Sequence, residues 1–153
     1  MLSCFDVARY FIAMIDEDAG DSISNLKLQK LVYYAQGFHL AMHEKPLFPE
    51  RIYAWAHGPV VEELYHEYKQ YGAGPISLAQ PFESEKYSPE MHAFLAEVNN
   101  VYGQFSATKL RNMTHAEPPW KDTLRGDEIT QSAMKEYFKT LLIYDDSEPR
   151  PKN

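Results

Sequence analysis

A helix predicted from residue 24 to residue 43 constrains the fold more than any other segment of the sequence. Ser24 suits its N-cap position, and apolar positions repeat along one side at three- and four-residue steps. That side consists of Leu28, Leu31, Val32, Ala35, Phe38, His39 and Met42. Tyr33, Tyr34 and Gly37 fall outside it, which predicts burial on more than one face. At about 1.5 Å per residue the helix is roughly 28 Å long, about the width of a small domain, so we expect it at the centre of the fold.

The segment after this helix changes its periodicity. Pro46 and Pro49 exclude helix from the sequence KPLFPE, and the alternation in RIYAWAH predicts a short strand from residue 51 to residue 56. Gly58 is expected to end the strand, and Pro59 is expected to occupy the first turn of a third helix. The apolar stripe of that helix is Val61, Leu64, Tyr65, Tyr68 and Tyr71, with Gly72 at its end.

The rest of the sequence predicts further helices and one long connection. A first helix begins with Ser3 as its N-cap and ends in the acidic segment from Asp16 to Asp21. The segment from Gly72 to Tyr87 is expected to be a connection with a brief strand at residues 76–78. Helices are predicted at 89–102 and, after Ser106 as N-cap, at 107–113. Two prolines then interrupt the helical pattern at 117–120, and a last helix runs from 130 to 142.

Together these elements predict a mainly α (α+β) fold. We expect a compact bundle of about six helices around a long central helix, with a small β element near residues 51–56. A chain of 153 residues is about the size of one domain, so residues 1–144 are expected to form a single domain. Residues 145–153 are expected to form a flexible tail.

Charge and composition narrow the choice of partners. The chain has 15 basic and 22 acidic residues and a net charge of −7, which repels a phosphate backbone, so nucleic acid is not an expected partner. A single cysteine, Cys4, excludes an internal disulfide and suits a reducing compartment. No apolar run is long enough to span a bilayer, and the first residues lack a basic leader or cleavage site. We expect a soluble, cytoplasmic protein with no membrane partner.

The sequence contains no recognisable enzyme motif. His39 and His43 are four residues apart on one predicted helix, but without HExxH or further ligands this spacing is weak evidence for zinc. His57 and His115 have no companion nucleophile, and Cys4 has no activating motif. There is no GxxxxGK, GxGxxG or GxSxG sequence. We therefore expect neither catalytic residues nor a metal or other cofactor.

Several short motifs resemble those of one family. LKLQKLVYYAQ, KPLF, AWAHGPVVEELY and YKQYG follow one another between residues 26 and 72, and THAEPPW follows at 114–120. In this order and spacing they resemble the Panacea antitoxin domain, also described as SocA-like or GepA-like phage-associated proteins. The resemblance spans about residues 6–125. The motif positions to which we assign a structural role are Leu28, Gln29, Leu31, Tyr33, Gln36, Trp55, Gly58, Pro59, Val60, Tyr65 and Tyr68.

The resemblance implies a mainly helical antitoxin that neutralises a cognate toxin by forming a protein complex. One branch of the family delivers its toxin to an ATP-dependent protease, so inhibition by occlusion and inhibition by delivery both stay open. Family members are paired with unrelated toxins, including alarmone-synthetase-like ones, so the resemblance does not identify the toxin. No helix-turn-helix module accompanies the motifs, so repression of its own operon is not supported. Two alternatives stay open, a small metal-dependent or histidine-based hydrolase and a phage-borne inhibitor of a host protein.

The expected toxin-binding surface combines exposed aromatic and basic residues. The chain has 11 Tyr and 8 Phe, and aromatic side chains are enriched at protein interfaces. We expect recognition to draw on the connection from Gly72 to Tyr87, where truncating Phe82 or Tyr87 should leave the fold nearly intact. Lys27 and Lys30 are expected on the solvated face of the central helix. The full set of expected partner-binding residues is Lys27, Lys30, Tyr34, Phe82, Tyr87 and Trp120.

Overall fold

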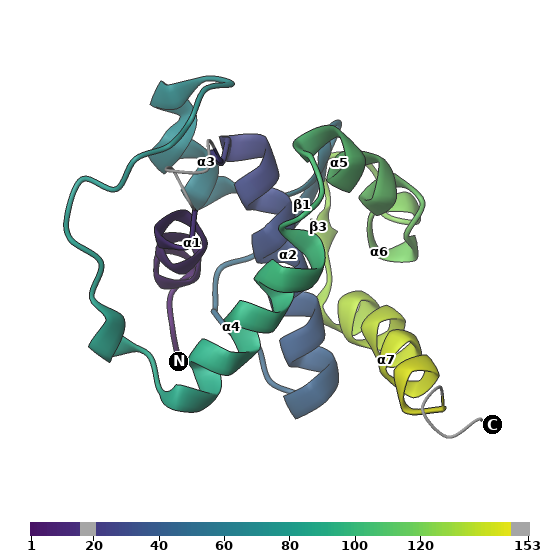
Figure 1. The fold of residues 1–153 in the computed structure, drawn as a ribbon. Helices are drawn as coiled ribbons and strands as arrows, with labels where there is room; N and C mark the ends of the chain where they lie inside the picture. The colour runs from purple at the N-terminus through teal and green to yellow at the C-terminus, as the bar shows by residue number, and fades with distance from the viewer. Residues whose placement is uncertain (16–20, 148–153) are drawn as a thin grey trace.

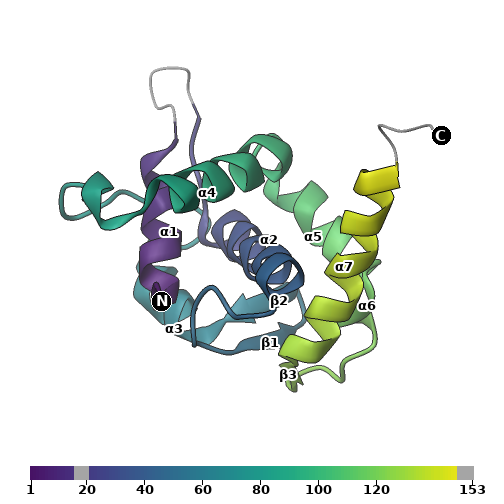
Figure 2. The same ribbon diagram turned by 90° about the horizontal axis from the view of Figure 1, so that it is seen from below.

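The long helix α2, Asn25–His43, lies at the centre of the molecule. The computed structural model describes residues 1–15 and 21–147, with side chains as far as residue 142. Figure 2 shows α2 nearly end-on, with helices around it and the sheet along one side. Ser24 caps the helix by accepting a hydrogen bond from Lys27 N at 3.2 Å, and Glu44 ends it in the left-handed conformation. Thirteen of its nineteen residues are buried, which confirms burial on more than one face.

The other helices pack around α2, as Figure 1 shows. The described residues form seven α-helices and a small sheet, which confirms the mainly α (α+β) class. The larger surrounding helices are α1 (Cys4–Ala13), α4 (Pro89–Tyr102), α5 (Ala107–His115) and α7 (Gln131–Ser147). Shorter ones are α3 (Glu62–Tyr68), the 3-10 helices Lys69–Tyr71 and Ser84–Lys86, and α6 (Pro118–Lys121). Gly37 lets α7 approach closely, because a side chain there would collide with the Phe138 ring.

The sheet has three antiparallel strands in the order β2-β1-β3. They are β1 (Ile52–Trp55), β2 (Gly58–Val61) and β3 (Glu128–Ile129). The expected strand near 51–56 is confirmed, but the predicted helix start at Pro59 is wrong, because Gly58 and Pro59 belong to β2 and α3 begins at Glu62. Trp55 pairs with Gly58, so a two-residue turn joins β1 and β2, and Gly58 has a φ of +114°. Proline is tolerated in β2 because this strand lies at the edge of the sheet.

Three other predicted element boundaries differ from the structure. The strand expected at 76–78 is absent, and Ile76 N only donates a single hydrogen bond to Ile23 O at 2.9 Å. The predicted interruption of the helical pattern is confined to residues 116–117, between α5 and α6, and Pro118 and Pro119 occupy the first turn of α6, where the missing N–H groups need no partner. The last helix, α7, continues to Ser147. The predicted helix end in the acidic segment falls mostly on residues 16–20, which lie outside the described residues. Of the tail predicted at 145–153, residues 145–147 belong to α7, and residues 148–153 lie outside the described residues.

Candidate functional site

Two polar residues of α2 cover the free edge of β2. The Gln29 side-chain amide accepts a hydrogen bond from Val61 N at 2.8 Å and donates one to Val61 O at 3.4 Å. Lys30 Nζ donates to Pro59 O at 3.1 Å. An uncovered strand edge is a template for pairing with another chain, and these side chains satisfy it as a neighbouring strand would. The central part of the LKLQK motif therefore holds the hairpin against α2.

A second glutamine of α2 holds the loop that follows the helix. Gln36 Nε2 donates to Phe48 O at 2.9 Å, and Gln36 Oε1 accepts from Leu47 N at 2.7 Å. Gln29 and Gln36 are seven residues apart, about two helical turns, so they lie on one face of α2. Both amides pair buried backbone groups, which would otherwise be left without hydrogen bonds. These contacts give the two glutamines a framework role.

Lys30 is buried, contrary to the expectation of a solvated face. Its side chain has no exposed area, and Gly58 leaves the space it occupies, because a Cβ there would lie 2.7 Å from Lys30 Cε. Burial, with a smaller contribution from the positive charge of Arg111, lowers the pKa of Lys30 to about 7. Lys27 is half-buried and donates to Gly103 O at 2.7 Å. The carbonyl oxygen of Pro59 on β2 explains why Lys30 is buried. The sequence around α2 did not indicate this contact.

Glu117 is a buried carboxylate that the sequence interpretation missed. It accepts hydrogen bonds from Tyr33 Oη at 3.0 Å and from Tyr34 Oη at 2.7 Å. Burial raises the pKa of Glu117 to about 7, although the two tyrosine hydrogen bonds act in the opposite direction. Tyr34, which we expected among the partner-binding residues, is fully buried, and its ring stacks on that of Tyr102 with centroids 4.0 Å apart. The signal that was available is the place of Glu117 within the THAEPPW motif.

We expect Glu117→Gln to flatten the dependence of stability on pH between pH 4.5 and pH 7. The ordinary pKa of a glutamate is 4.5 and that of Glu117 is about 7, so between these values the folded state binds more protons than the unfolded state. Stability from this group is therefore present at low pH and falls by at most about 3 kcal/mol as the pH rises to 7. Urea unfolding at several pH values measures it. The exposed control Glu136→Gln should keep the wild-type slope, and an unchanged slope in Glu117→Gln would contradict the pKa assignment.

Trp120 joins α6 to the hairpin instead of standing free at the surface. Its Nε1 donates to Trp55 O at 2.7 Å. The His115 ring stacks parallel to the indole at 3.8 Å, and the Arg125 guanidinium lies 3.5 Å from the ring centroid. Trp120 is half-buried, and its indole ring is in contact with both His115 and Arg125.

The histidines do not converge on a catalytic or metal-binding arrangement. His39 contacts His43 with ring centroids 4.7 Å apart, whereas His57 Nδ1 accepts from Arg111 Nε at 3.3 Å. Among the described residues no three His, Cys, Asp or Glu side chains are placed to hold a metal ion. Cys4 is buried, and burial raises the pKa of its thiol, which disfavours the reactive thiolate.

Chelation should therefore leave the melting temperature unchanged. A structural metal would contribute folding free energy through its ligands, and no such ligand group exists in the part of the chain that the structure describes. The check compares thermal unfolding before and after dialysis against a chelator, together with elemental analysis. A stoichiometric metal, or a fall of several degrees after chelation, would contradict the prediction.

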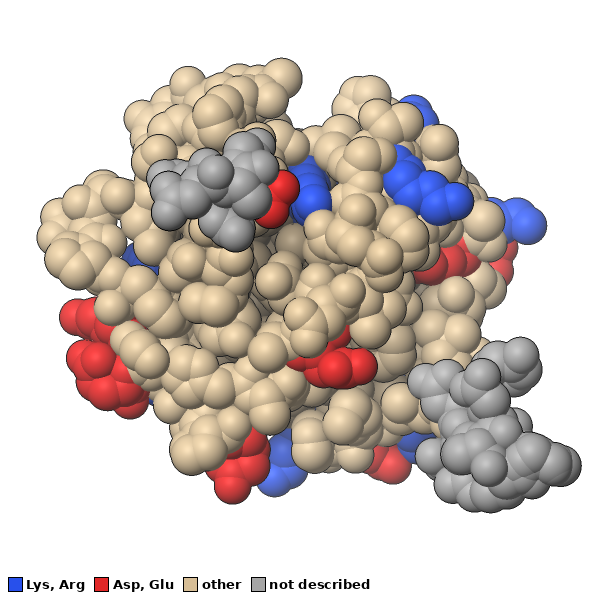
Figure 3. Space-filling view, in the orientation of Figure 1, with Lys and Arg blue, Asp and Glu red and all other residues tan. Residues whose placement is uncertain are grey.

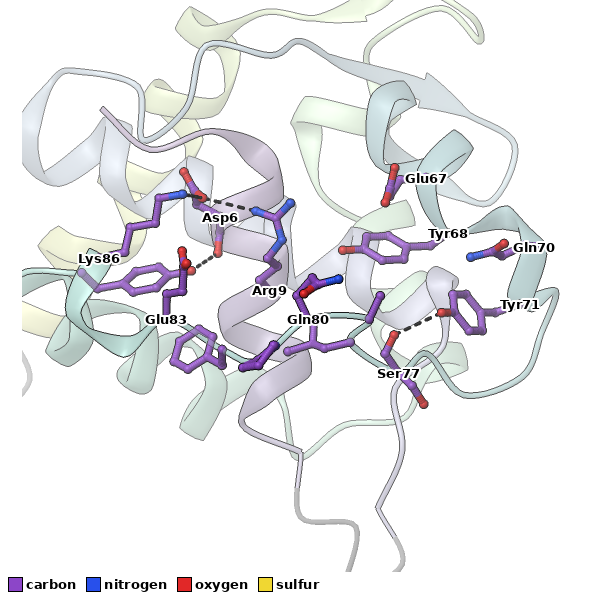
Figure 4. Close-up of a pocket in the computed structure, with 15 residues that line it drawn as sticks. Asp6, Arg9, Glu67, Tyr68, Gln70, Tyr71, Ser77, Gln80, Glu83 and Lys86 are labelled. Carbon is purple, nitrogen blue, oxygen red and sulfur yellow. Dashed lines mark hydrogen bonds and ion pairs between the residues drawn. The ribbon is translucent and has the colours of Figure 1, made fainter.

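The connection expected to bind the toxin forms one wall of a polar pocket, shown in Figure 4. The pocket has a volume of about 410 Å³ and lies between α1, the connection and the 3-10 helix Lys69–Tyr71. Lys86 pairs with Asp6 Oδ1 at 2.9 Å, and Tyr71 Oη donates to Ser77 O at 3.1 Å. Both ends of the connection are thus tied to the helices behind it.

Tyr87 is buried, so the expectation of an exposed ring at this position is wrong. Its hydroxyl donates to Asp6 O at 2.6 Å, and its ring lies 5.8 Å from Tyr10. Phe82 is half-buried and stacks on Tyr87 at 5.3 Å. The two rings fasten the connection to α1. Of the six expected partner-binding residues, Lys30, Tyr34 and Tyr87 are buried. The other three contact different parts of the fold: Lys27 contacts Gly103, Phe82 contacts Tyr87 and Trp120 contacts Trp55.

A second concave surface, which we call the hairpin groove, lies where α2, the β1-β2 turn and the end of α3 meet. It has a volume of about 710 Å³. The basic and aromatic residues that line it are Lys30, Trp55, His57, Tyr65, Lys69 and Arg125. Of the expected structural motif residues, Leu28, Leu31, Tyr33, Gly58, Pro59, Val60 and Tyr68 are buried, Trp55 is half-buried and Tyr65 is exposed. Sequence periodicity gave no indication of this groove, because its walls come from four separate segments.

Comparison with known proteins places the motifs in a family. The family model described as Antitoxin SocA-like, Panacea domain, matches residues 28–121, from within α2 to the end of α6. Antitoxin SocA of Caulobacter vibrioides (strain NA1000 / CB15N) is 31% identical over 109 residues. The matched region covers 64% of this chain and 58% of that relative. No solved structure matches. None of the described helices is both long enough and apolar enough to cross a membrane.

Proposed function

The chain belongs to the family of SocA-like antitoxins with a Panacea domain, and on this premise we propose that it neutralises a cognate toxin protein by binding it directly. The family match supports this proposal because it covers 28–121, which contains most of α2, the β1-β2 hairpin and α3 to α6. The relative named above is an antitoxin, and the matched region spans 58% of its length. Direct binding is the step that occlusion of the toxin and delivery to an ATP-dependent protease have in common.

The observation that favours a binding protein over a hydrolase is that the polar residues of the motifs form hydrogen bonds inside the fold. Gln29, Lys30 and Gln36 pair backbone groups of β2 and of the loop after α2. Glu117 is enclosed by two tyrosine hydroxyls. Catalytic groups instead converge on a cavity within reach of one another and of a substrate. The family match and the structural role of the polar motif residues both favour a binding protein without enzymatic activity.

Co-expression with the product of the adjacent gene should relieve growth arrest. The expected result is that the neighbour alone stops growth and that growth returns when this chain is expressed with it. The matched control is Leu28→Ala, which removes a fully buried side chain and costs about 2 to 5 kcal/mol of stability, so it should rescue poorly. A harmless neighbour, together with no neutralisation of any toxin from the same genome, would contradict the proposed function. If this chain instead inhibits a host protein when no toxin is present, the phage-borne inhibitor is favoured.

A further inference from the structure

The lining of the hairpin groove includes basic side chains, on a protein whose net charge is −7. Lys69 and Arg125 contribute exposed cations, His57 contributes an imidazole, and Lys30 lies buried in the wall of the groove. Among the described residues that line the groove, none is Asp or Glu. The chain as a whole has 22 acidic and 15 basic residues, so the lining reverses the overall composition. Such a groove attracts anionic groups of a partner.

Two of these cations are held in place by the fold. Lys30 is fully buried, and its ammonium has three donors, of which one goes to Pro59 O at 3.1 Å. The Arg125 guanidinium lies against Trp120, and Arg125 Nη1 donates to Trp120 O at 2.9 Å. The exposed Arg125 guanidinium keeps further N–H donors for a ligand, whereas Lys30 has no exposed area. Because Arg125 is already positioned, little of its side-chain entropy is lost when a ligand binds.

The positive region continues from the groove onto α5. Arg111 donates to His57 Nδ1 at 3.3 Å and so extends the cationic lining. Burial lowers the pKa of the His115 imidazole, and four nearby cationic or imidazole groups lower it further. They are Arg111, Lys30, Arg125 and His57. Figure 3 shows several basic side chains over α5 and α6 at the upper right, with acidic side chains beside them at the right edge and others in the centre, at the left and along the bottom.

The groove also offers apolar contact beside the charges. The rings of Trp55 and Tyr65 meet edge to face with centroids 5.1 Å apart, and Tyr65 is 38% exposed. Leu26 and Val60 add aliphatic surface. Exposed Trp and Tyr rings beside cations are typical of the centres of protein interfaces. An occupant that matches both features has carboxylates next to apolar side chains.

We infer that the hairpin groove holds an acidic segment of the toxin, with its carboxylates toward the exposed cations Lys69 and Arg125. Apolar side chains of the same segment contact Trp55 and Tyr65. This inference rests on the proposed function and names the surface through which it acts. A protein segment suits the groove better than nucleic acid does, because a phosphate backbone would continue beyond it over an acidic protein.

The test reverses one charge in the groove and measures the affinity for the product of the adjacent gene by calorimetry. Lys69→Glu is suitable because Lys69 is exposed and forms no ion pair with any described residue. Lys45→Glu is the matched control, with the same change of charge at the far end of α2. Lys69→Glu should weaken binding roughly tenfold and reduce its dependence on salt, and Lys45→Glu should change affinity less than about twofold. A charge reversal at an acidic residue of the toxin should restore affinity to Lys69→Glu.

Two outcomes would overturn the inference while the proposed function stands. One is wild-type affinity of Lys69→Glu for a toxin that the wild-type chain neutralises. The other is binding of a single-stranded oligonucleotide of about ten nucleotides that depends on Lys69, which would replace the peptide by a phosphate ligand. If the wild-type chain neither binds nor neutralises any cognate toxin, the proposed function itself fails and the inference fails with it.

Discussion

Replacing Gln29 with alanine is expected to lower the free energy of unfolding by about 2 to 6 kcal/mol. The substitution leaves Val61 N and Val61 O buried without their side-chain partner, and each unsatisfied group costs about 1 to 3 kcal/mol. The edge of β2 would also lose part of its cover, so aggregation should increase together with the loss of stability. Urea unfolding measures the free energy, and light scattering measures aggregation.

Gln131→Ala is the matched control for this prediction. Gln131 is exposed at the first residue of α7, so its removal should change stability by less than about 0.5 kcal/mol. If Gln29→Ala unfolds at the same urea concentration as Gln131→Ala, the hydrogen bonds to Val61 do not hold the hairpin. The framework role of the LKLQK motif would then be wrong.

Tyr87→Ala is expected to cost about 3 to 5 kcal/mol of stability, as large buried aromatic residues do. The variant loses the ring that packs on Tyr10 and Phe82, and the hydrogen bond to Asp6 O at 2.6 Å. Because this contact ties the connection to α1, proteolysis within residues 72–87 should become faster in the variant. Thermal unfolding and limited proteolysis measure the two effects.

Two variants separate packing from recognition in this region. Tyr87→Phe keeps the ring and removes only the hydroxyl, so it should lose about 1 to 2 kcal/mol. Phe82→Ala removes a half-buried ring and should cost less than Tyr87→Ala. If Tyr87→Ala kept wild-type stability but lost affinity for the toxin, the connection would be the recognition surface after all.

Local sequence signals predicted most of the helices. Ser3, Ser24, Ser88 and Ser106 each cap the helix that follows them, because an N-cap depends only on the next few residues. The strand β1 was likewise visible in its alternation. In contrast, Gly58-Pro59 has the local features of a helix start, and only pairing with β1 makes it a strand. Pairing between segments is not encoded in a window of a few residues.

The candidate site was less accessible from the sequence than the fold. A lysine such as Lys30 is usually solvated. Lys30 is buried because a hydrogen-bond acceptor, the carbonyl oxygen of Pro59, lies beside it although it is 29 residues later in the sequence. Glu117 was hidden for a similar reason, since its partners Tyr33 and Tyr34 are more than 80 residues away. The hairpin groove is assembled from α2, the hairpin, the end of α3 and residues 125–126. Its positive charge appears only when these segments meet.

Calorimetric titration of the purified product of the adjacent gene with this protein tests the central proposal most directly, because occlusion and delivery to a protease both require the complex. We expect saturable binding at a fixed stoichiometry with a Kd of about 1 µM or tighter, or about −8 kcal/mol. Co-expression of the two proteins should also protect cells in which no protease is overexpressed. Neutralisation by direct contact would be contradicted if no binding were detected up to about 100 µM. This outcome counts only if the product of the adjacent gene is toxic and this chain is folded.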